Sequence, residues 1–374
     1  MGEWNCAVER LERMIFETFK GKTVLVTGHT GFKGSWLCLW LAQLGAEVHG
    51  FSLPPNTEPN HYTAARISQL LKSEKSGDIR DQNTLSTYIR SVQPDCIFHL
   101  AAQPLVRKSY AEPVETFDTN VMGSIHVMDA VRSLVKPCSV VMITSDKCYE
   151  NVGKAEGYVE TDPMGGHDPY SASKGCAELA VASYRRSFFP PADVAKHGVM
   201  LASVRAGNVV GGGDWAEDRI VPDAVRAVIS GRSLEIRSPT AVRPWQHVLE
   251  PLSGYMLLAA KMMQTNSAVY ADGWNFGPKE NSPAVTVAEI IDTFYNVWGK
   301  GKAEYDTETK HLHEAAYLTL SSKKSESVLS WKQQWDVMDT MKRTAEWYKN
   351  FYAGADAREL SLTDIAAYMN HLEY

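Results

Sequence analysis

The stretch KTVLVTGHTGFKGSW, residues 22–36, decides the fold class of this chain. It begins with an apolar, β-branched run, and Gly28, Gly31 and Gly34 follow directly at the spacing GxxGxxG. A helical stretch then extends to about Leu44. Glycines permit a tight turn and let the backbone approach a pyrophosphate, and a helix N-terminus offers N–H groups and the positive end of its dipole to the anion. The stretch therefore predicts the phosphate-binding loop of a dinucleotide-binding domain.

Further apolar runs repeat the strand pattern of this first one. They cover residues 46–53, 96–102 and 140–145, and helical stretches separate them. Alternating strands and helices indicate βαβ units, which build a parallel sheet covered by helices on both faces. We therefore predict an α/β fold with a doubly wound, Rossmann-type parallel sheet.

The organisation of the chain changes after about residue 175. The stretches GNVVGGGDWAEDR and IRSPTAVRPWQHVLEP are polar, with glycine or proline and interleaved arginines, and a helical pattern returns at 286–298. We expect a lead-in helix at residues 1–20, a dinucleotide-binding domain with the catalytic residues at 21–205, and a smaller C-terminal α/β lobe at 206–374. This lobe is expected mainly to bind substrate, with some elements returning to the first domain.

Composition and charge exclude several classes of protein. The net charge of −6 argues against nucleic-acid binding, and no apolar run reaches the roughly 18 residues of a membrane span. The N-terminal residues are charged throughout and show no signal-peptide core, so we expect a cytoplasmic protein. The six cysteines lack metal-binding spacing and are expected to be reduced thiols, so no metal site is predicted.

Tyr170 and Lys174, in DPYSASKGCAEL, lie four residues apart on a predicted helix and therefore share one face. A tyrosine has an ordinary pKa of about 10 and is a poor base at neutral pH. A neighbouring ammonium group and the positive charge of a nicotinamide favour the phenolate, so we expect the pKa of Tyr170 to be lowered. The pair can then take a proton from an alcohol as hydride leaves to the cofactor. Ser145, at the end of an apolar run, supports this interpretation.

The cofactor is predicted to be NAD. The second strand ends in GFSLPP, without the acid that usually holds the adenosine ribose, and Ser52 can bond a ribose hydroxyl there. No arginine stands beside it for a 2′-phosphate, so NAD is favoured over NADP, and loose binding is expected. In GDIRD, Asp78 is predicted to accept from the adenine amino group and Ile79 to pack against the ring. The complete predicted cofactor set is Gly28, His29, Gly31, Phe32, Lys33, Gly34, Ser52, Asp78, Ile79, Leu100, Ala101, Ala102, Gln103, Tyr170 and Lys174.

The GxxGxxG loop, the strand-end serine and the YxxxK pair together resemble the extended short-chain dehydrogenase/reductase family. Within this family, TSDKCYEN, RAGNVVGGGDW and RPWQHVLEP closely resemble the sugar-nucleotide 4,6-dehydratases that act on CDP-glucose. The resemblance implies conversion of CDP-glucose to CDP-4-keto-6-deoxyglucose with recycled NAD. It places this step early in the synthesis of deoxy sugars for bacterial surface polysaccharides such as the O-antigen of lipopolysaccharide. It also implies a homodimer or homotetramer.

This reaction suggests a role for each polar residue after the run 140–145. Tyr170 would deprotonate the C4 hydroxyl while Ser145 orients its oxygen, and Asp146 would protonate the leaving C6 hydroxyl, which requires a raised pKa. Related dehydratases carry a glutamate as the C5 base at the position of Lys147. Lys147 is either that base, if burial and nearby cations lower its pKa, or it steadies the Asp146 carboxylate or the enolate-like oxygen while another group or a water takes the proton.

The diphosphate of a sugar nucleotide is expected to be bound by arginines of the irregular half, because guanidinium groups grip phosphates bidentately. By resemblance, Asn208 contacts the diphosphate region, and Arg243 and His247 line the nucleotide side. The complete predicted substrate set is Gln103, Ser145, Asn208, Arg219, Arg237, Arg243 and His247. Three further residues are better explained by packing or backbone bonding than by catalysis, namely His99, Asn120 and Cys148.

Two other functions use the same fold. An epimerase or reductase of nucleotide sugars needs only Ser145, Tyr170 and Lys174, so the pair Asp146 and Lys147 argues against it. A non-catalytic, NAD-sensing regulator tends to lose the tyrosine or the lysine, and both are present here.

Overall fold

A computed structural model describes residues 17–154, 156–236, 238–265, 267–279, 282, 285–305 and 318–372. The lead-in helix predicted at residues 1–20 lies mostly outside this part of the chain, and residues 17–19 are helical. Phe19, in this helical segment, is fully buried. No helix within these described ranges is both long and apolar enough to cross a lipid bilayer.

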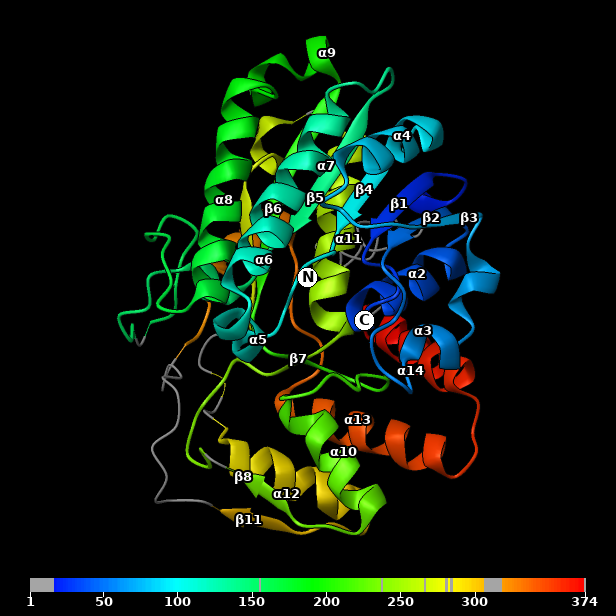
Figure 1. The fold of residues 1–374 in the computed structure, drawn as a ribbon, viewed down its shortest axis with the longest axis vertical. Coiled ribbons are helices and arrows are strands. Elements are labelled where there is room, and N and C mark those ends of the chain that lie inside the picture. The colour runs from blue at the N-terminus through cyan, green and yellow to red at the C-terminus, as the bar shows by residue number, and fades with distance from the viewer. Residues whose placement is uncertain are drawn as a thin grey trace, which may run out of the picture.

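The centre of the fold is a seven-stranded sheet in which every pair of neighbours is parallel. Its order is β10-β6-β5-β4-β1-β2-β3 (Figure 1). The strands are β1 (Thr23–Thr27), β2 (Glu47–Ser52), β3 (Ser73–Ser76), β4 (Cys96–His99), β5 (Cys138–Ile143), β6 (Val199–Ala206) and β10 (Gly273–Phe276). The direction of winding reverses between β1 and β4, and ligands of such sheets bind at the carboxyl ends of the strands there. The predicted doubly wound α/β fold is confirmed.

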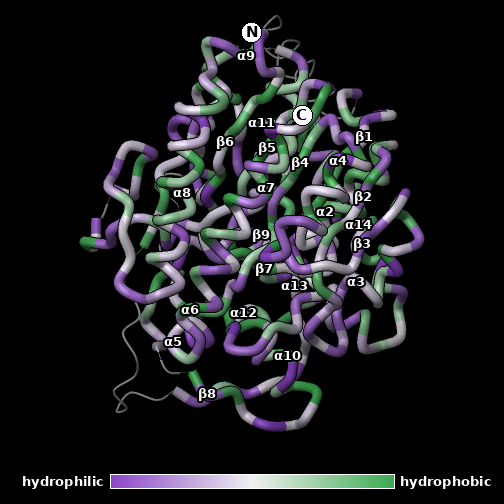
Figure 2. Tube along the Cα trace, turned by 45° about the horizontal axis from the view of Figure 1, so that its top comes forward, coloured by the Kyte–Doolittle hydropathy of each residue, from purple (hydrophilic) through white to green (hydrophobic). Residues whose placement is uncertain are grey.

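Helices cover both faces of this sheet. One face carries α4 (Gln82–Val92), α7 (Gly123–Val131) and α8 (Pro169–Ser187), and the other carries α2 (Phe32–Gln43) and α11 (Leu249–Gln264). The side chains of β1 alternate between two apolar cores, because Val24 and Val26 pack on the α2 side and Leu25 on the α4 side. A strand buried on both faces has a continuous apolar sequence. Figure 2 shows this apolar character along the central strands.

The C-terminal half contributes to both parts of the molecule. β10 and α11 lie with the main sheet, and α14 (Ala357–His371) packs against α2. A smaller lobe lies below the sheet in the view of Figure 1. It contains α10 (Ile220–Ser230), β8 (Leu234–Ile236), α12 (Val287–Trp298), β11 (Ala303–Tyr305) and α13 (Val337–Tyr352). Its part in substrate binding stays a prediction.

Short elements connect these parts at the carboxyl ends of the strands. β7 (Val209–Val210) pairs with β9 (Gln246–His247), just after β6 and just before α11. The remaining short helices are α3 (His61–Ala64), α5 (Val106–Ala111), α6 (Pro113–Phe117) and α9 (Val194–His197).

Candidate active site

The glycine loop joins β1 to α2 in a conformation that excludes side chains. Gly28 has a φ of +75°, and a Cβ on it would lie 2.7 Å from the backbone nitrogen of Ala101, beyond β4. A Cβ on Gly34 would lie 2.1 Å from the carbonyl oxygen of Gly28. Gly31 caps α2 without a side-chain bond, and the first turn carries no acid. The backbone N–H groups there suit the pyrophosphate of a dinucleotide.

The predicted catalytic turn, Ser145–Cys148, follows β5 directly. Ser145 caps the 3₁₀ turn Asp146–Cys148, and its hydroxyl donates to Asp146 Oδ1 at 2.9 Å. Asp146 is 2% exposed, and its Oδ2 has no hydrogen-bond partner within the described residues. Burial raises the pKa of Asp146, against the opposing charge of Lys147 and the bond from Ser145. A raised pKa favours the protonated form of the carboxyl group, which is the form that a general acid needs.

Tyr170 and Lys174 lie on the buried face of α8, beside this turn. The structure places Tyr170 close enough to Ser145 for the serine hydroxyl to act on the pKa of the buried phenol. Burial raises the pKa of Tyr170 to about 12, outweighing the bond with Ser145 and the charge of Arg219. The predicted lowering of the Tyr170 pKa is therefore wrong for the protein without cofactor, because desolvation of the phenolate is the larger effect. Burial likewise lowers the pKa of Lys174 to about 8.

Cations surround the Asp146 carboxyl group. Lys33, from the glycine loop, is close enough to Lys174, Arg219 and Asp146 for their charges to act on it. Burial, followed by the charges of Lys174 and Arg219, lowers the pKa of Lys33 to about 7. Its ammonium group donates to the buried Tyr255 hydroxyl at 3.5 Å. Lys147 is half-buried.

The side chain of His29 does not face this centre. Its Nε2 lies 2.9 Å from Glu74 Oε2 on β3, and its ring packs against Gly50, where a Cβ would approach to 2.6 Å. Glu74 and the space beside Gly50 hold the ring of His29 under the loop, and a contact of His29 with the cofactor stays a prediction.

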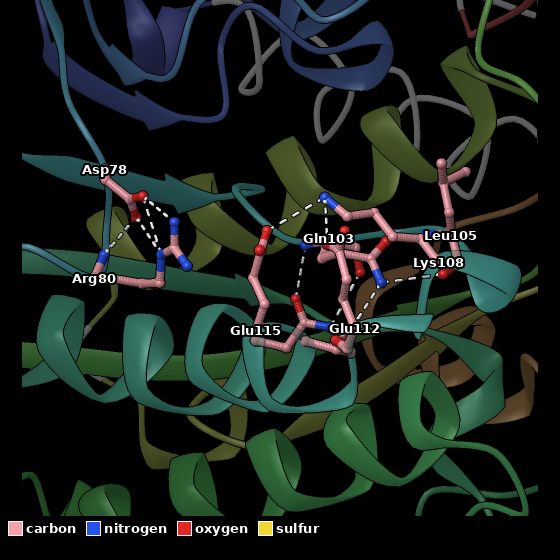
Figure 3. A network of polar contacts seen from close by, with 9 residues as sticks. Asp78, Arg80, Gln103, Leu105, Lys108, Glu112 and Glu115 are labelled. Carbon is pink, nitrogen blue, oxygen red and sulfur yellow. Dashed lines mark hydrogen bonds and ion pairs between the residues drawn. The ribbon is translucent and has the colours of Figure 1, made fainter. Parts of the chain in front are cut away.

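The expected adenosine end lies at the ends of β2 and β3. Ser52 Oγ hydrogen-bonds with Thr30 Oγ1 at 2.9 Å. Asp78 accepts from the backbone and the guanidinium of Arg80, with Nη2 at 2.7 Å from Oδ2 (Figure 3). Ile79 is buried against Gly123. The pairing with Arg80 was not predicted, and the contacts of Asp78 and Ile79 with adenine stay a prediction.

Gln103 follows β4, and the hydrogen bonds of its side-chain amide are made with Leu105 and Thr116. Its Nε2 donates to Thr116 Oγ1 and to the Leu105 carbonyl, and its Oε1 accepts from Leu105 N–H (Figure 3). The side chain is therefore used to shape its own loop, which corrects the predicted contact with the sugar. Leu100, Ala101 and Ala102 stand beside the glycine loop at the end of β4, where their predicted cofactor contacts remain open.

The predicted nucleotide-binding residues divide into four groups. Arg219 donates to Asp214 Oδ2 at 2.7 Å and lies near Tyr170, while Arg243 lies near Asp146. Asn208 is half-buried between β6 and β7. His247 is fully buried with its ring against Trp36 and Trp335, so the predicted substrate contact is corrected to a core position. Arg237 lies outside the described residues.

The three residues assigned to packing or backbone bonding are confirmed in that role. His99 is buried between Thr27 and Ser124. Asn120 bonds the Gln103 backbone at both N–H and C=O. Cys148 is fully buried, and burial raises the pKa of its thiol well above the usual range.

Comparison with known proteins identifies the family. A family model described as GDP-mannose 4,6 dehydratase matches residues 25–344. The chain belongs to the GDP-mannose 4,6-dehydratase family. The CDP-glucose 4,6-dehydratase of Salmonella typhimurium is 48% identical over 358 residues, covering 96% of this chain and 99% of that relative. The predicted relationship to sugar-nucleotide dehydratases is confirmed.

Solved structures share the fold of this dehydratase-family chain. A UDP-glucose 4-epimerase from Stenotrophomonas maltophila, with bound NAD, gives a TM-score of 0.74 at 22% identity, covering 89% of this chain and 100% of that one. A dTDP-glucose 4,6-dehydratase from Bacillus anthracis in complex with NAD gives 0.70 at 19% identity, covering 90% and 99%. At these identities the likeness establishes the fold alone.

Sequence reasoning did not predict two residues that the structure places beside the Asp146 carboxyl group, Lys33 and Tyr255. Lys33 was assigned to the cofactor loop, although its side chain reaches the Asp146 cluster. Tyr255 lies in the apolar run of α11, and nothing in its local pattern separates it from core residues. The sequence did contain one signal for Lys33, because it is a lysine at the start of an otherwise largely apolar helix.

Proposed function

We propose that this protein converts CDP-D-glucose to CDP-4-keto-6-deoxy-D-glucose and water. The observation that carries this proposal is the 48% identity to a CDP-glucose 4,6-dehydratase over nearly the full length of both chains. The chemistry of the site supports it, because the buried Asp146 carboxyl group lies beside Ser145 and Tyr170. Oxidation at C4 needs only Ser145 and Tyr170, whereas elimination of water also needs an acid such as Asp146.

NAD is the cofactor that fits the site. NAD, when bound, supplies oxidation by accepting the C4 hydride and returning it to C6. The uncapped first turn of α2 suits its pyrophosphate, and the close approach at Gly28 and Gly34 admits no larger residue there. Ser52, Asp78 and Ile79 are proposed to hold the adenosine end.

The protein's own groups move the protons. Tyr170 takes the proton of the C4 hydroxyl, with Ser145 orienting that oxygen and Lys174 beside it. The ketone at C4 makes the C5 proton acidic, and Lys147 is proposed to remove it. Asp146 protonates the C6 hydroxyl, which leaves as water, and C5 regains a proton when the hydride returns to C6. Lys33, whose pKa of about 7 also suits a base, is the second candidate for the C5 step.

The nucleotide end of the substrate is proposed to lie against the smaller lobe. Arg219 and Arg243 supply positive charge next to the catalytic groups, as a diphosphate requires. Asn208 lies on the connection between the sheet and β7. Arg237 is retained as a proposed contact from the sequence.

The surroundings of the enzyme are also part of the proposal. Exposed apolar side chains on α6, on α8 and between α6 and α7 support a homodimer or homotetramer, and they include Val114, Met122 and Leu179. We place the enzyme in the cytoplasm, where its product would enter deoxysugar synthesis for surface polysaccharides such as O-antigen. An epimerase, a reductase or a regulator is not favoured, because none of them needs a protonated Asp146.

A panel of sugar nucleotides tests the proposed function. The protein with added NAD is incubated separately with CDP-, UDP-, dTDP- and GDP-glucose and with GDP-mannose. We expect the alkali-induced ultraviolet absorbance of a 4-keto-6-deoxy product with CDP-glucose, and much less with the other four. Epimerised sugar, or net formation of NADH without dehydration, would instead assign the protein to the epimerases or dehydrogenases.

A further inference from the structure

Behind the catalytic turn lies a buried ion pair that the proposed chemistry does not use. Glu178, on α8, and Arg205, on β6, are each 4% exposed, and Arg205 Nη2 lies 2.8 Å from Glu178 Oε2. Two buried charges are costly to desolvate, and replacing such a pair with apolar residues is often neutral or stabilising. Stability alone therefore does not explain why the chain has this ion pair.

Glu178 holds the residue that precedes the catalytic turn. Its Oε1 accepts from the Thr144 hydroxyl, and its Oε2 accepts from Ser203 Oγ at 2.7 Å as well as from Arg205. Thr144 is joined directly to Ser145 and also bonds the Val204 carbonyl. Residues at the ends of β5 and β6 thus donate hydrogen bonds to the same carboxylate, that of Glu178.

Arg205 holds the residue that follows the turn. Its Nη1 donates to the Tyr149 hydroxyl at 2.5 Å, and its guanidinium lies 5.1 Å from the centre of that ring. Tyr149 in turn donates to Asn275 Oδ1 at 2.8 Å, on β10. Tyr149 is joined directly to Cys148, the last residue of the turn.

Glu178 also lies on α8, the helix that carries Tyr170. Glu178 lies four residues after Lys174 and eight after Tyr170, and all three face the protein interior. Burial lowers the pKa of Lys174, and Cys148 and Glu178 act in the opposite direction. One ion pair therefore contacts both flanks of the turn and the helix of Tyr170.

We propose that Glu178 and Arg205 form a positioning pair that fixes the turn Ser145–Cys148 relative to Tyr170 and Lys174. The inference rests on the proposed dehydration, because Asp146 must meet C6 while Tyr170 meets C4 of the same sugar. Displacement of reacting groups by about 1 Å can cost of the order of 100-fold in rate. The pair touches neither substrate nor cofactor and acts through the turn.

The test removes one arm of the network without removing a charge. Tyr149→Phe deletes the hydroxyl that Arg205 bonds, and Thr144→Val deletes the one that Glu178 bonds. Tyr368→Phe is the matched control, because the buried Tyr368 hydroxyl donates to the buried Glu250 at 2.8 Å, away from the turn. Glu178→Gln is the stronger variant, and the hydroxyl variants carry the test if it does not fold.

We expect Tyr149→Phe and Thr144→Val to lower kcat with CDP-glucose by about 10- to 100-fold at nearly unchanged KM. We also expect a larger steady-state fraction of enzyme-bound NADH, because C4 oxidation tolerates a displaced Asp146 better than elimination does. Tyr368→Phe should change neither quantity. Equal kcat and NADH fractions in all three variants and the wild type, or losses that only follow the folded fraction, would overturn the proposal.

A second measurement separates this inference from the proposed function. Amide hydrogen exchange at residues 145–149 is measured without substrate, and Tyr149→Phe should accelerate it while Tyr368→Phe should not. Wild-type protein that leaves CDP-glucose unchanged would refute the dehydration alone, whereas unaltered exchange in Tyr149→Phe would refute the positioning pair.

Discussion

Replacing Tyr170 with phenylalanine is expected to abolish turnover of CDP-glucose, with a fall in kcat of about 10²- to 10⁴-fold, the usual contribution of a general base. The substitution removes only the phenolic hydroxyl near Ser145, so the buried ring remains on α8. No NADH should accumulate, because loss of the base stops the reaction before hydride leaves C4. Steady-state kinetics and the near-ultraviolet absorbance of NADH measure both effects.

The pH dependence gives an independent check on this role. Burial raises the pKa of Tyr170 to about 12 in the protein by itself, so the phenolate fraction grows as the pH increases toward that value. A bound nicotinamide carries positive charge, which favours the phenolate and moves the rising limb to lower pH. Wild-type kcat/KM should therefore rise with pH, and the residual rate of Tyr170→Phe should lack this limb. A variant that keeps the limb or most of the activity would contradict the assignment.

Asp146→Asn is expected to separate oxidation from elimination. Asparagine has nearly the same size but cannot donate a proton to the C6 hydroxyl, so dehydration should slow by about 10²- to 10⁴-fold. Tyr170 and Ser145 remain, so NADH should form with CDP-glucose and persist. This combination of NADH without 4-keto-6-deoxy product distinguishes Asp146→Asn from Tyr170→Phe in one assay.

The stability of Asp146→Asn provides its control. The folded-state pKa of Asp146 is raised by burial, so ionisation of this group above its unfolded pKa disfavours the native state. A neutral amide removes that penalty, and the variant should melt no earlier than the wild type at neutral pH. Loss of activity together with a large fall in melting temperature would indicate misfolding. Full dehydration by a stable Asp146→Asn would show that another group is the acid.

The parts of the fold that were predicted from the sequence are those with strong apolar runs. β1, β2 and β4 fall within predicted runs and β5 overlaps the run 140–145, because a strand covered on both faces cannot carry many polar residues. β3 is the edge strand beside β2 and has the exposed sequence SEKS, so it leaves no apolar signal. β6 is fully buried, but it contains Ser203 and Arg205, which read as surface residues until Glu178 is seen beside them.

The same distinction applies to the site. Ser145, Asp146, Tyr170 and Lys174 were found because each pair is close in the chain and the strand order brings the two segments together. His247 and Gln103 were misassigned because both side chains have structural partners that are not adjacent in the sequence. His247 packs against Trp335, and Gln103 donates to Thr116 and so shapes its own loop. These partners are brought together by the tertiary structure, so a local sequence pattern does not predict them.

The most direct test of the central claim follows the hydrogen at C4. CDP-glucose carrying deuterium at C4 is converted by the wild-type protein with NAD, and the product is analysed by NMR and mass spectrometry. We expect the deuterium at C6 of the 4-keto-6-deoxy product, since the hydride that leaves C4 returns to the same sugar. Deuterium found in released NADH, or a product without label at C6, would contradict dehydration by a recycled cofactor.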